Sequence, residues 1–114
     1  LGVEQLTHDP EMQAATEKDP LYIRNVTPKW FTESNAAQAA LFSNAAKFKL
    51  PMLTVQGAED PIANPDGSKA FHEAAGSTDK TYKPLDGMKH EVFNELGRAK
   101  LFADVIAWLD AHLA

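Results

Sequence analysis

The sequence predicts an α/β fold in which two parallel strands are flanked by helices. The first observation is a short, mostly apolar run, Met52–Gln56, which Gly57 ends and which suits a strand buried on both faces. The second is a later extended segment, Thr81–Leu85, and the third is a helical pattern between them, Ser68–Ala75. A strand, a helix and a second strand in this order form a crossover whose strands run in the same direction.

Two helical signals precede the first strand. Asp9, followed by proline, predicts the N-cap of a short helix over residues 10–16. Thr27, also followed by proline, predicts the start of a longer helix that runs to about Phe48. The apolar positions at roughly helical spacing in this second helix are Phe31, Ala37, Leu41, Ala45 and Phe48.

The remaining elements follow the same reasoning. Gly76 is placed to end the helix over Ser68–Ala75, and Pro84 lies near the end of the second strand, where a lost ladder bond is tolerated. A last helix is expected from about Glu95 to His112, with one apolar face docked on the sheet. The predicted order is therefore helix, strand, helix, strand, helix.

Length and composition limit the function. The 114 residues suffice for one domain with a modest core, and the apolar content of 44% is ordinary for a globular protein. The net charge of −5 and the scattered basic residues argue against nucleic acid as a partner. No apolar run approaches a membrane span, and cysteine is absent. We expect a soluble protein, with the cytoplasm favoured over secretion, although the compartment itself stays open.

Asp60 and His90 are the candidate catalytic residues. Each lies in the loop after a predicted strand, and the carboxyl ends of parallel strands open on the same edge of a sheet, where ligands bind. A carboxylate that accepts from one imidazole nitrogen fixes the tautomer, so that the other nitrogen can take a proton from a serine hydroxyl. The alternative is that Asp60 caps a turn with Pro61, while His90 is a loop residue partly packed on Met88.

Other polar residues have simpler interpretations. His72 and Glu73 are expected on the surface, and His8 and His112 are expected to face solvent. Asp60, Asn64 and Asp66 suggest a calcium loop, but apolar Ile62 and Phe71 interrupt its pattern, so no metal or other cofactor is expected. Trp30 and Trp108 are interpreted as core or cap packing. No serine of the sequence occupies a strand-to-helix turn, the position that would expose it as a nucleophile. The serines are Ser34, Ser43, Ser68 and Ser77.

The run Leu50–Asp60, followed 30 residues later by His90 in Gly87–Glu91, resembles the C-terminal half of the α/β-hydrolase superfamily. The resemblance is greatest to its monoacylglycerol lipase and lysophospholipase-like branch. The entry segment, Leu6–Glu11 with Asp19–Leu21, is similar to the cap region that leads back to the sheet in those enzymes. The resemblance assigns residues 1–30 to the end of the cap and residues 31–114 to the C-terminal part of the core.

The resemblance implies that Asp60 is the triad acid and His90 the triad base, while the nucleophilic serine has no counterpart in the 114 residues. The resemblance implies that the substrates are carboxylic esters, such as lipid monoesters or lysophospholipids. An amide substrate is the open alternative. Two parallel strands alone are rarely stable. We therefore expect the sheet to be completed by a missing N-terminal half of the same hydrolase or by a second copy of this chain.

A second hypothesis belongs to another class. The chain could be a non-catalytic interaction module that kept the C-terminal part of the fold and binds a partner through its exposed sheet. Alone, the chain is expected not to hydrolyse esters efficiently under either hypothesis, because it lacks the nucleophile.

Overall fold

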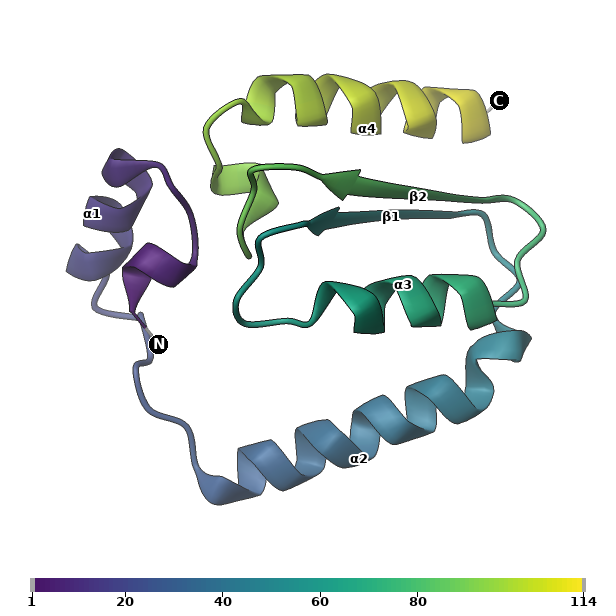
Figure 1. The fold of residues 1–114 in the computed structure, drawn as a ribbon, viewed down its shortest axis with the longest axis horizontal. Helices are drawn as coiled ribbons and strands as arrows, with labels where there is room; N and C mark the ends of the chain where they lie inside the picture. Colours follow the sequence, from purple (N-terminus) through teal and green to yellow (C-terminus); the bar gives the residue numbers. More distant parts are fainter. Residues whose placement is uncertain (1, 114) are drawn as a thin grey trace.

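The computed structural model describes residues 2–113 and contains a two-stranded parallel sheet with flanking helices. Strand β1 (Met52–Gly57) pairs with β2 (Lys80–Leu85) in a register that places Met52 opposite Lys80 and Gly57 opposite Leu85. Figure 1 shows α3 along one side of the sheet and α4 along the other, with both arrows pointing towards the N-terminal segment. The predicted α/β class and the parallel strands are confirmed.

Helix α3 (Pro65–Ala74) makes the crossover between the strands and begins three residues before the predicted start. The Asn64 side chain accepts a hydrogen bond from the backbone N–H of Asp66, and Pro65 occupies the first helical position. An asparagine N-cap followed by proline is a strong helix start, and this signal explains the earlier boundary.

The first two helices start where the sequence predicts. Asp9 caps α1 (Pro10–Lys18) by accepting from two backbone N–H groups, and Thr27 caps α2 (Pro28–Asn44) by accepting from one. The expected end of the second helix near Phe48 is only partly right. The α-helix stops at Asn44 and continues as a 3-10 turn, η2 (Ala45–Lys47).

The last helix begins three residues after its predicted start near Glu95. A 3-10 turn, η3 (Val92–Asn94), comes first, and α4 (Arg98–His112) begins only after Gly97. Gly97 has a φ of +81°, a left-handed conformation that interrupts a right-handed helix and that glycine adopts without steric cost. The boundary is important for the site, because it leaves Glu95 outside the helix with its side chain turned inward.

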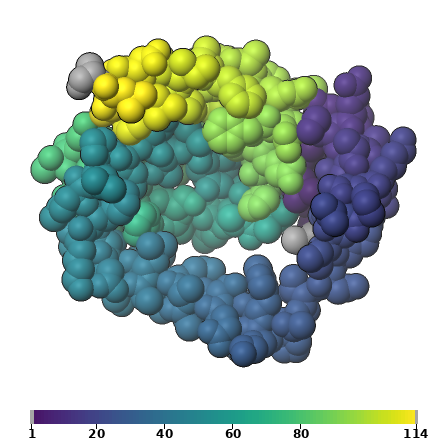
Figure 2. Space-filling model, turned by 180° about the vertical axis from the view of Figure 1, so that it is seen from behind, coloured from purple at the N-terminus to yellow at the C-terminus, as the bar shows by residue number. Residues whose placement is uncertain are grey.

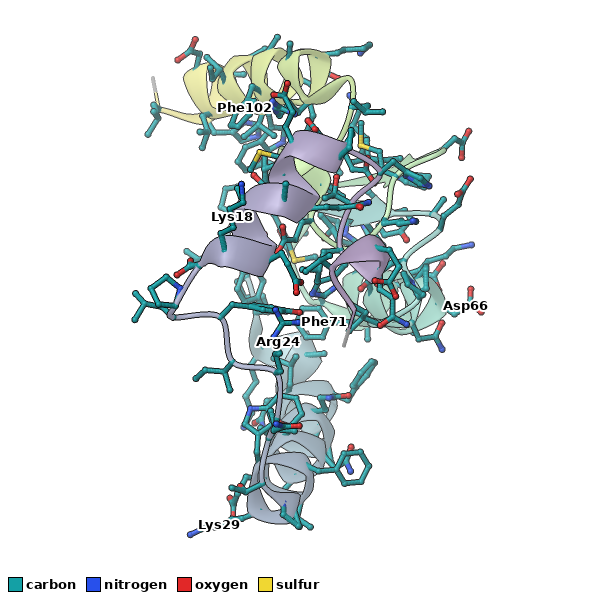
Figure 3. All side chains as sticks on the ribbon, turned by 90° about the vertical axis from the view of Figure 1, so that its left-hand side faces the viewer. Lys18, Arg24, Lys29, Asp66, Phe71 and Phe102 are labelled. Atoms are coloured by element: carbon teal, nitrogen blue, oxygen red, sulfur yellow. The ribbon has the colours of Figure 1, made fainter. Side chains whose placement is uncertain are left out.

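The core within residues 2–113 is small, and much of the apolar surface is open. The buried apolar side chains include Leu101 and Val92, whereas Trp30 and Phe31 on α2 are 56% and 60% exposed. The sequence predicts that Trp30 packs in the core or the cap, but among residues 2–113 it is largely exposed. Figure 2 shows an opening between α2 and the rest of the molecule, and Figure 3 shows Lys29 at the far end of α2, opposite Phe102 of α4.

Candidate active site

The loops after the two strands lie side by side. The backbone N–H of Ala58 donates to the carbonyl of Leu85, and that of Glu59 donates to the carbonyl of Met88 at 3.0 Å. Gly57 makes this approach possible, because a Cβ atom there would lie 2.0 Å from the carbonyl oxygen of Lys89. A side chain at Gly57 would push the second loop away from the first.

These loops bring Asp60 and His90 together, 30 residues apart in sequence. The Nδ1 atom of His90 lies 3.0 Å from Oδ2 of Asp60. The Asp60 side chain is 2% exposed and that of His90 is 37% exposed, so the acid is buried while the ring reaches the surface. Within residues 2–113, the Nε2 atom of His90 has no hydrogen-bond partner, which leaves it free to exchange a proton with a ligand or nucleophile.

Asp60 is held by further donors. Its Oδ1 atom accepts from the backbone N–H groups of Ile62 and Ala63, at 2.8 and 2.9 Å. Its Oδ2 atom accepts from Nε2 of Gln56 at 2.9 Å. Burial alone would raise the pKa of Asp60, but these hydrogen bonds and the one from His90 outweigh burial and place the pKa below the ordinary value of 3.8. Asp60 is therefore ionised at neutral pH and oriented from both oxygens.

Gln56 has its own anchor. Its Oε1 atom accepts from the hydroxyl of Ser68, in the first turn of α3, at 2.7 Å. A chain of hydrogen bonds thus runs from α3 through the end of β1 to the acid. From the sequence alone, Ser68 is expected only to be a polar residue at a helix end. Gln56 could not be predicted to have a role, because it lies at the end of a mostly apolar strand without a recognisable motif.

A second acid and histidine pair lies next to the first. Glu95 is 1% exposed, and its Oε1 atom lies 2.9 Å from Nδ1 of His8. The same carboxylate accepts from the backbone N–H groups of His8, Lys89 and Leu96. His8 is exposed as expected, with 37% of its side chain accessible, but it has a partner in Glu95 that the sequence does not indicate. No local signal marked this pair, since its members are 87 residues apart.

Two other histidines also have partners. His72 is 7% exposed rather than on the surface, and its Nδ1 atom lies 3.0 Å from the hydroxyl of Thr54. His112, expected to face solvent, stacks on Trp108 and lies 3.1 Å from a carboxylate oxygen of Asp79. Neither makes a hydrogen bond or an ion pair with His90.

The described serines do not reach His90. Ser43, on α2, donates to the carbonyl of Ala39, Ser68 donates to Gln56, and Ser77 donates to the carbonyl of Asp79. No hydrogen bond among residues 2–113 joins a serine hydroxyl to the ring of His90. Within residues 2–113, the structure therefore joins the acid to the histidine by a hydrogen bond but joins no serine to the histidine.

The described residues contain neither a group of metal ligands nor a membrane-spanning helix. Across residues 2–113, no three histidine, aspartate or glutamate side chains are grouped as metal ligands. In the suspected calcium loop, Asn64 caps α3 and Asp60 is occupied by the donors described above. No helix in that part of the chain has the length and apolar character needed to cross a bilayer.

One face of the sheet carries an apolar groove of about 460 Å³. It lies between β1 and α4, and its lining includes Phe48, Leu53, Phe93 and Trp108. The indole N–H of Trp108 is buried and has no hydrogen-bond partner within residues 2–113. An open apolar groove with an unsatisfied donor is unusual for a completed core.

Comparisons with known proteins agree with this architecture. Residues 1–97 match the family described as Serine aminopeptidase, S33. The chain is 26% identical over 114 residues to Phospholipase YtpA from Bacillus subtilis, and 29% identical over 114 residues to a Monoacylglycerol lipase from Mycolicibacterium smegmatis. Each alignment covers 99% of this chain, but only 44% and 41% of the two relatives.

Solved structures give the same result. The chain superposes with a TM-score of 0.84 on a crystal structure of a soluble variant of monoglyceride lipase from Saccharomyces cerevisiae in complex with a substrate analog, at 25% identity. It superposes equally well on the monoacylglycerol lipase of Paleococcus ferrophilus, at 26% identity. These matches cover 98% of this chain and 42% and 44% of the solved chains. The chain therefore belongs to the Serine aminopeptidase, S33 family of the α/β-hydrolase superfamily.

Proposed function

We propose that Asp60 and His90 are the acid and the base of a serine hydrolase that cleaves carboxylic esters. The observation that carries this proposal is the 3.0 Å contact between a buried, multiply hydrogen-bonded carboxylate and a histidine whose other nitrogen is open. Both residues follow adjacent parallel strands, at the sheet edge where α/β enzymes bind ligands. The lipase and phospholipase names of the relatives support an ester as substrate.

The chemistry follows from the two ring nitrogens. Asp60 accepts a hydrogen bond from the Nδ1–H of His90, which leaves Nε2 as the base that takes the proton of a serine hydroxyl. The serine oxygen bonds to the ester carbonyl carbon, and Nε2 returns the proton to the departing alcohol. Water then hydrolyses the acyl–serine bond by the same proton transfers, and the carboxylic acid leaves.

The nucleophile is proposed to come from polypeptide outside these 114 residues. The family keeps its serine on an earlier strand-to-helix turn, and the chain spans less than half of its relatives. The same N-terminal polypeptide would pair with the free edge of β1 and fill the groove beside Trp108, where an acceptor would satisfy the indole N–H. A second copy of this chain is the other candidate for covering the sheet.

The substrate class is proposed from the relatives and from α2. A monoacylglycerol or a lysophospholipid carries one acyl chain, which needs an apolar entrance. Residues 1–30 are proposed to be the end of a cap, and the exposed Trp30 and Phe31 at the start of α2 would line that entrance in the intact enzyme. An unchanged preference for acyl length in a Trp30→Ala variant would contradict this role.

The proposal is tested by labelling with a fluorophosphonate and by hydrolysis of monoolein, using the intact hydrolase in which residues 1–114 are combined with the polypeptide that supplies the serine. The wild-type protein should be labelled and should hydrolyse the ester. Asp60→Asn should lower kcat on the order of 10⁴-fold, because the wrong tautomer is favoured, and His90→Gln should lower it at least as much. Asp66→Asn, which removes an exposed carboxylate six residues away, serves as the matched control and should keep full activity.

The outcome also separates the two classes of function. If the wild-type protein is neither labelled nor active, the proposal fails, and the exposed apolar groove would favour the interaction module. If an amide substrate is cleaved instead of monoolein, the triad assignment stands and the ester assignment is wrong, since the same acid and base serve both reactions.

A further inference from the structure

We infer that Glu95 is a positioning residue for His90, which holds the His90 loop against residues 6–8. The inference rests on the proposed function, because it concerns the base of that reaction. It adds a residue that lies outside the Asp60–His90 pair and touches neither of its side chains. The evidence is the set of hydrogen bonds on the two sides of His90.

Both backbone neighbours of His90 are fixed. The N–H of Lys89 donates to Oε1 of Glu95 at 2.9 Å, and the N–H of Glu91 donates to the carbonyl of Leu6 at 2.8 Å. Because the loop is bound on each side of His90, the Cα position of the histidine is fixed independently of the hydrogen bond between its ring and Asp60. Preorganisation of this kind matters, since a shift of about 1 Å can cost on the order of 100-fold in rate.

The carboxylate of Glu95 is unusually well satisfied. Four donors reach it, two on each oxygen, and its side chain is 1% exposed. A buried carboxylate with fewer partners would be strongly unfavourable, so this set of donors accounts for its burial. A fully bonded carboxylate has one orientation, and this orientation gives Lys89 a fixed acceptor.

Glu95 also joins the loop to the N-terminal segment. His8 donates to it through its backbone N–H at 3.1 Å and contacts it through Nδ1 at 2.9 Å. The hydroxyl of Thr7 donates to the carbonyl of Asn94 at 2.8 Å. The position of His90 therefore depends on the segment that precedes α1, which Figure 1 shows at the carboxyl ends of both strands.

A nearby ion pair provides the matched control. Asp9, 5% exposed, accepts from Nη1 of Arg98 at 2.6 Å and also joins the N-terminal segment to the start of α4. It makes no bond to the loop that carries His90. Asp9→Asn thus removes a buried carboxylate from the same interface, whereas Glu95→Gln removes the one that binds Lys89.

The experiment compares these two variants with the wild-type protein by NMR and kinetics. The first readout is the low-field proton resonance of the His90 Nδ1–H, which reports its hydrogen bond to Asp60. Glu95→Gln places an NH2 group where an oxygen accepts two hydrogen bonds, so one pair of donors loses its acceptor. We expect the resonance to broaden or disappear in Glu95→Gln and to persist in Asp9→Asn.

The second readout is the hydrolysis of monoolein under conditions where each variant is folded. Glu95→Gln should lower kcat roughly 10- to 100-fold with little change in KM, because the base moves while the substrate site stays. Asp9→Asn should keep kcat within about threefold. A normal resonance and a normal kcat in Glu95→Gln would overturn the inference, as would equal losses in both variants.

Two further results keep the inference separate from the proposed function. If Glu95→Gln does not fold, hydrogen exchange of the Lys89 amide in the wild-type protein decides: protection supports the bond to Glu95, and unprotected exchange overturns the inference. If the wild-type protein lacks activity while the His90 resonance still responds to Glu95→Gln, the proposed function fails and the positioning by Glu95 stands.

Discussion

Gln56 donates a hydrogen bond to the same oxygen of Asp60 that His90 contacts. The Gln56 Nε2 atom lies 2.9 Å from Oδ2 of Asp60, and the His90 Nδ1 atom lies 3.0 Å from it. The acid is thus oriented by a strand residue that is itself anchored on α3. Side chains that support a functional group in this way decide its geometry as much as the group itself.

The first prediction concerns this support. Gln56→Leu removes the donor to Asp60 and leaves the Ser68 hydroxyl without its acceptor, which should lower the free energy of unfolding by about 1–3 kcal/mol. Urea denaturation measures the change. Ser68→Ala removes only the outer bond and should cost about 1 kcal/mol or less. Equal stability of Gln56→Leu and the wild-type protein would contradict this account.

The second prediction concerns the contact between the two loops. Gly57→Ala would place a Cβ atom 2.0 Å from the carbonyl oxygen of Lys89, and backbone cannot yield as a flexible side chain can. We expect a loss of about 3 kcal/mol in thermal or urea unfolding. Gly67→Ala is the control, because nothing lies within 4 Å of a Cβ atom there, and alanine should stabilise α3 by about 0.5–1 kcal/mol. A neutral Gly57→Ala would show that the loops do not pack as described.

These elements also show what the sequence alone could predict. The caps Asp9 and Thr27 are predictable because the signal is local, and the contact between Asp60 and His90 is predictable because it depends on strand order. The sequence instead predicts that Glu95 belongs to the last helix, whereas α4 begins at Arg98. Its partner His8 is 87 residues away. No local sequence pattern around either residue indicates the pair, because only tertiary packing brings the two together.

The third prediction is a pH dependence of stability that comes from Glu95. Burial alone would raise the pKa of Glu95, but its hydrogen bonds outweigh burial and lower the pKa below the ordinary 4.5. A lowered folded pKa stabilises the protein above the unfolded value, and this stabilisation is lost as the pH falls through the folded value. The wild-type advantage over Glu95→Gln in free energy of unfolding should therefore be constant from pH 7 to about 5 and shrink below about 4.5. An advantage that grows on acidification would contradict the assignment.

The fourth prediction has the opposite sign. The carbonyl of Trp108 raises the pKa of His112, burial opposes this, and the Asp79 carboxylate adds to the increase above 6.5. A raised folded pKa contributes stability that is fully present below the unfolded value and is lost as the pH rises through the folded value. His112→Gln should therefore be less stable than the wild-type protein at pH 5.5, and the difference should shrink as the pH rises well above 6.5, to the part that comes from the stacking of His112 on Trp108. In an Asp79→Asn background the difference at low pH should be smaller, and an unchanged difference would remove Asp79 from the explanation.

The central claim is that Asp60 and His90 activate a serine supplied by polypeptide outside residues 1–114. The most direct measurement is peptide mapping of the fluorophosphonate adduct on the purified protein, in the wild-type form and in His90→Gln. The account predicts an adduct on a serine outside these residues, with labelling largely lost in His90→Gln. An adduct on Ser34, Ser43, Ser68 or Ser77, or labelling that His90→Gln leaves unchanged, would contradict the claim.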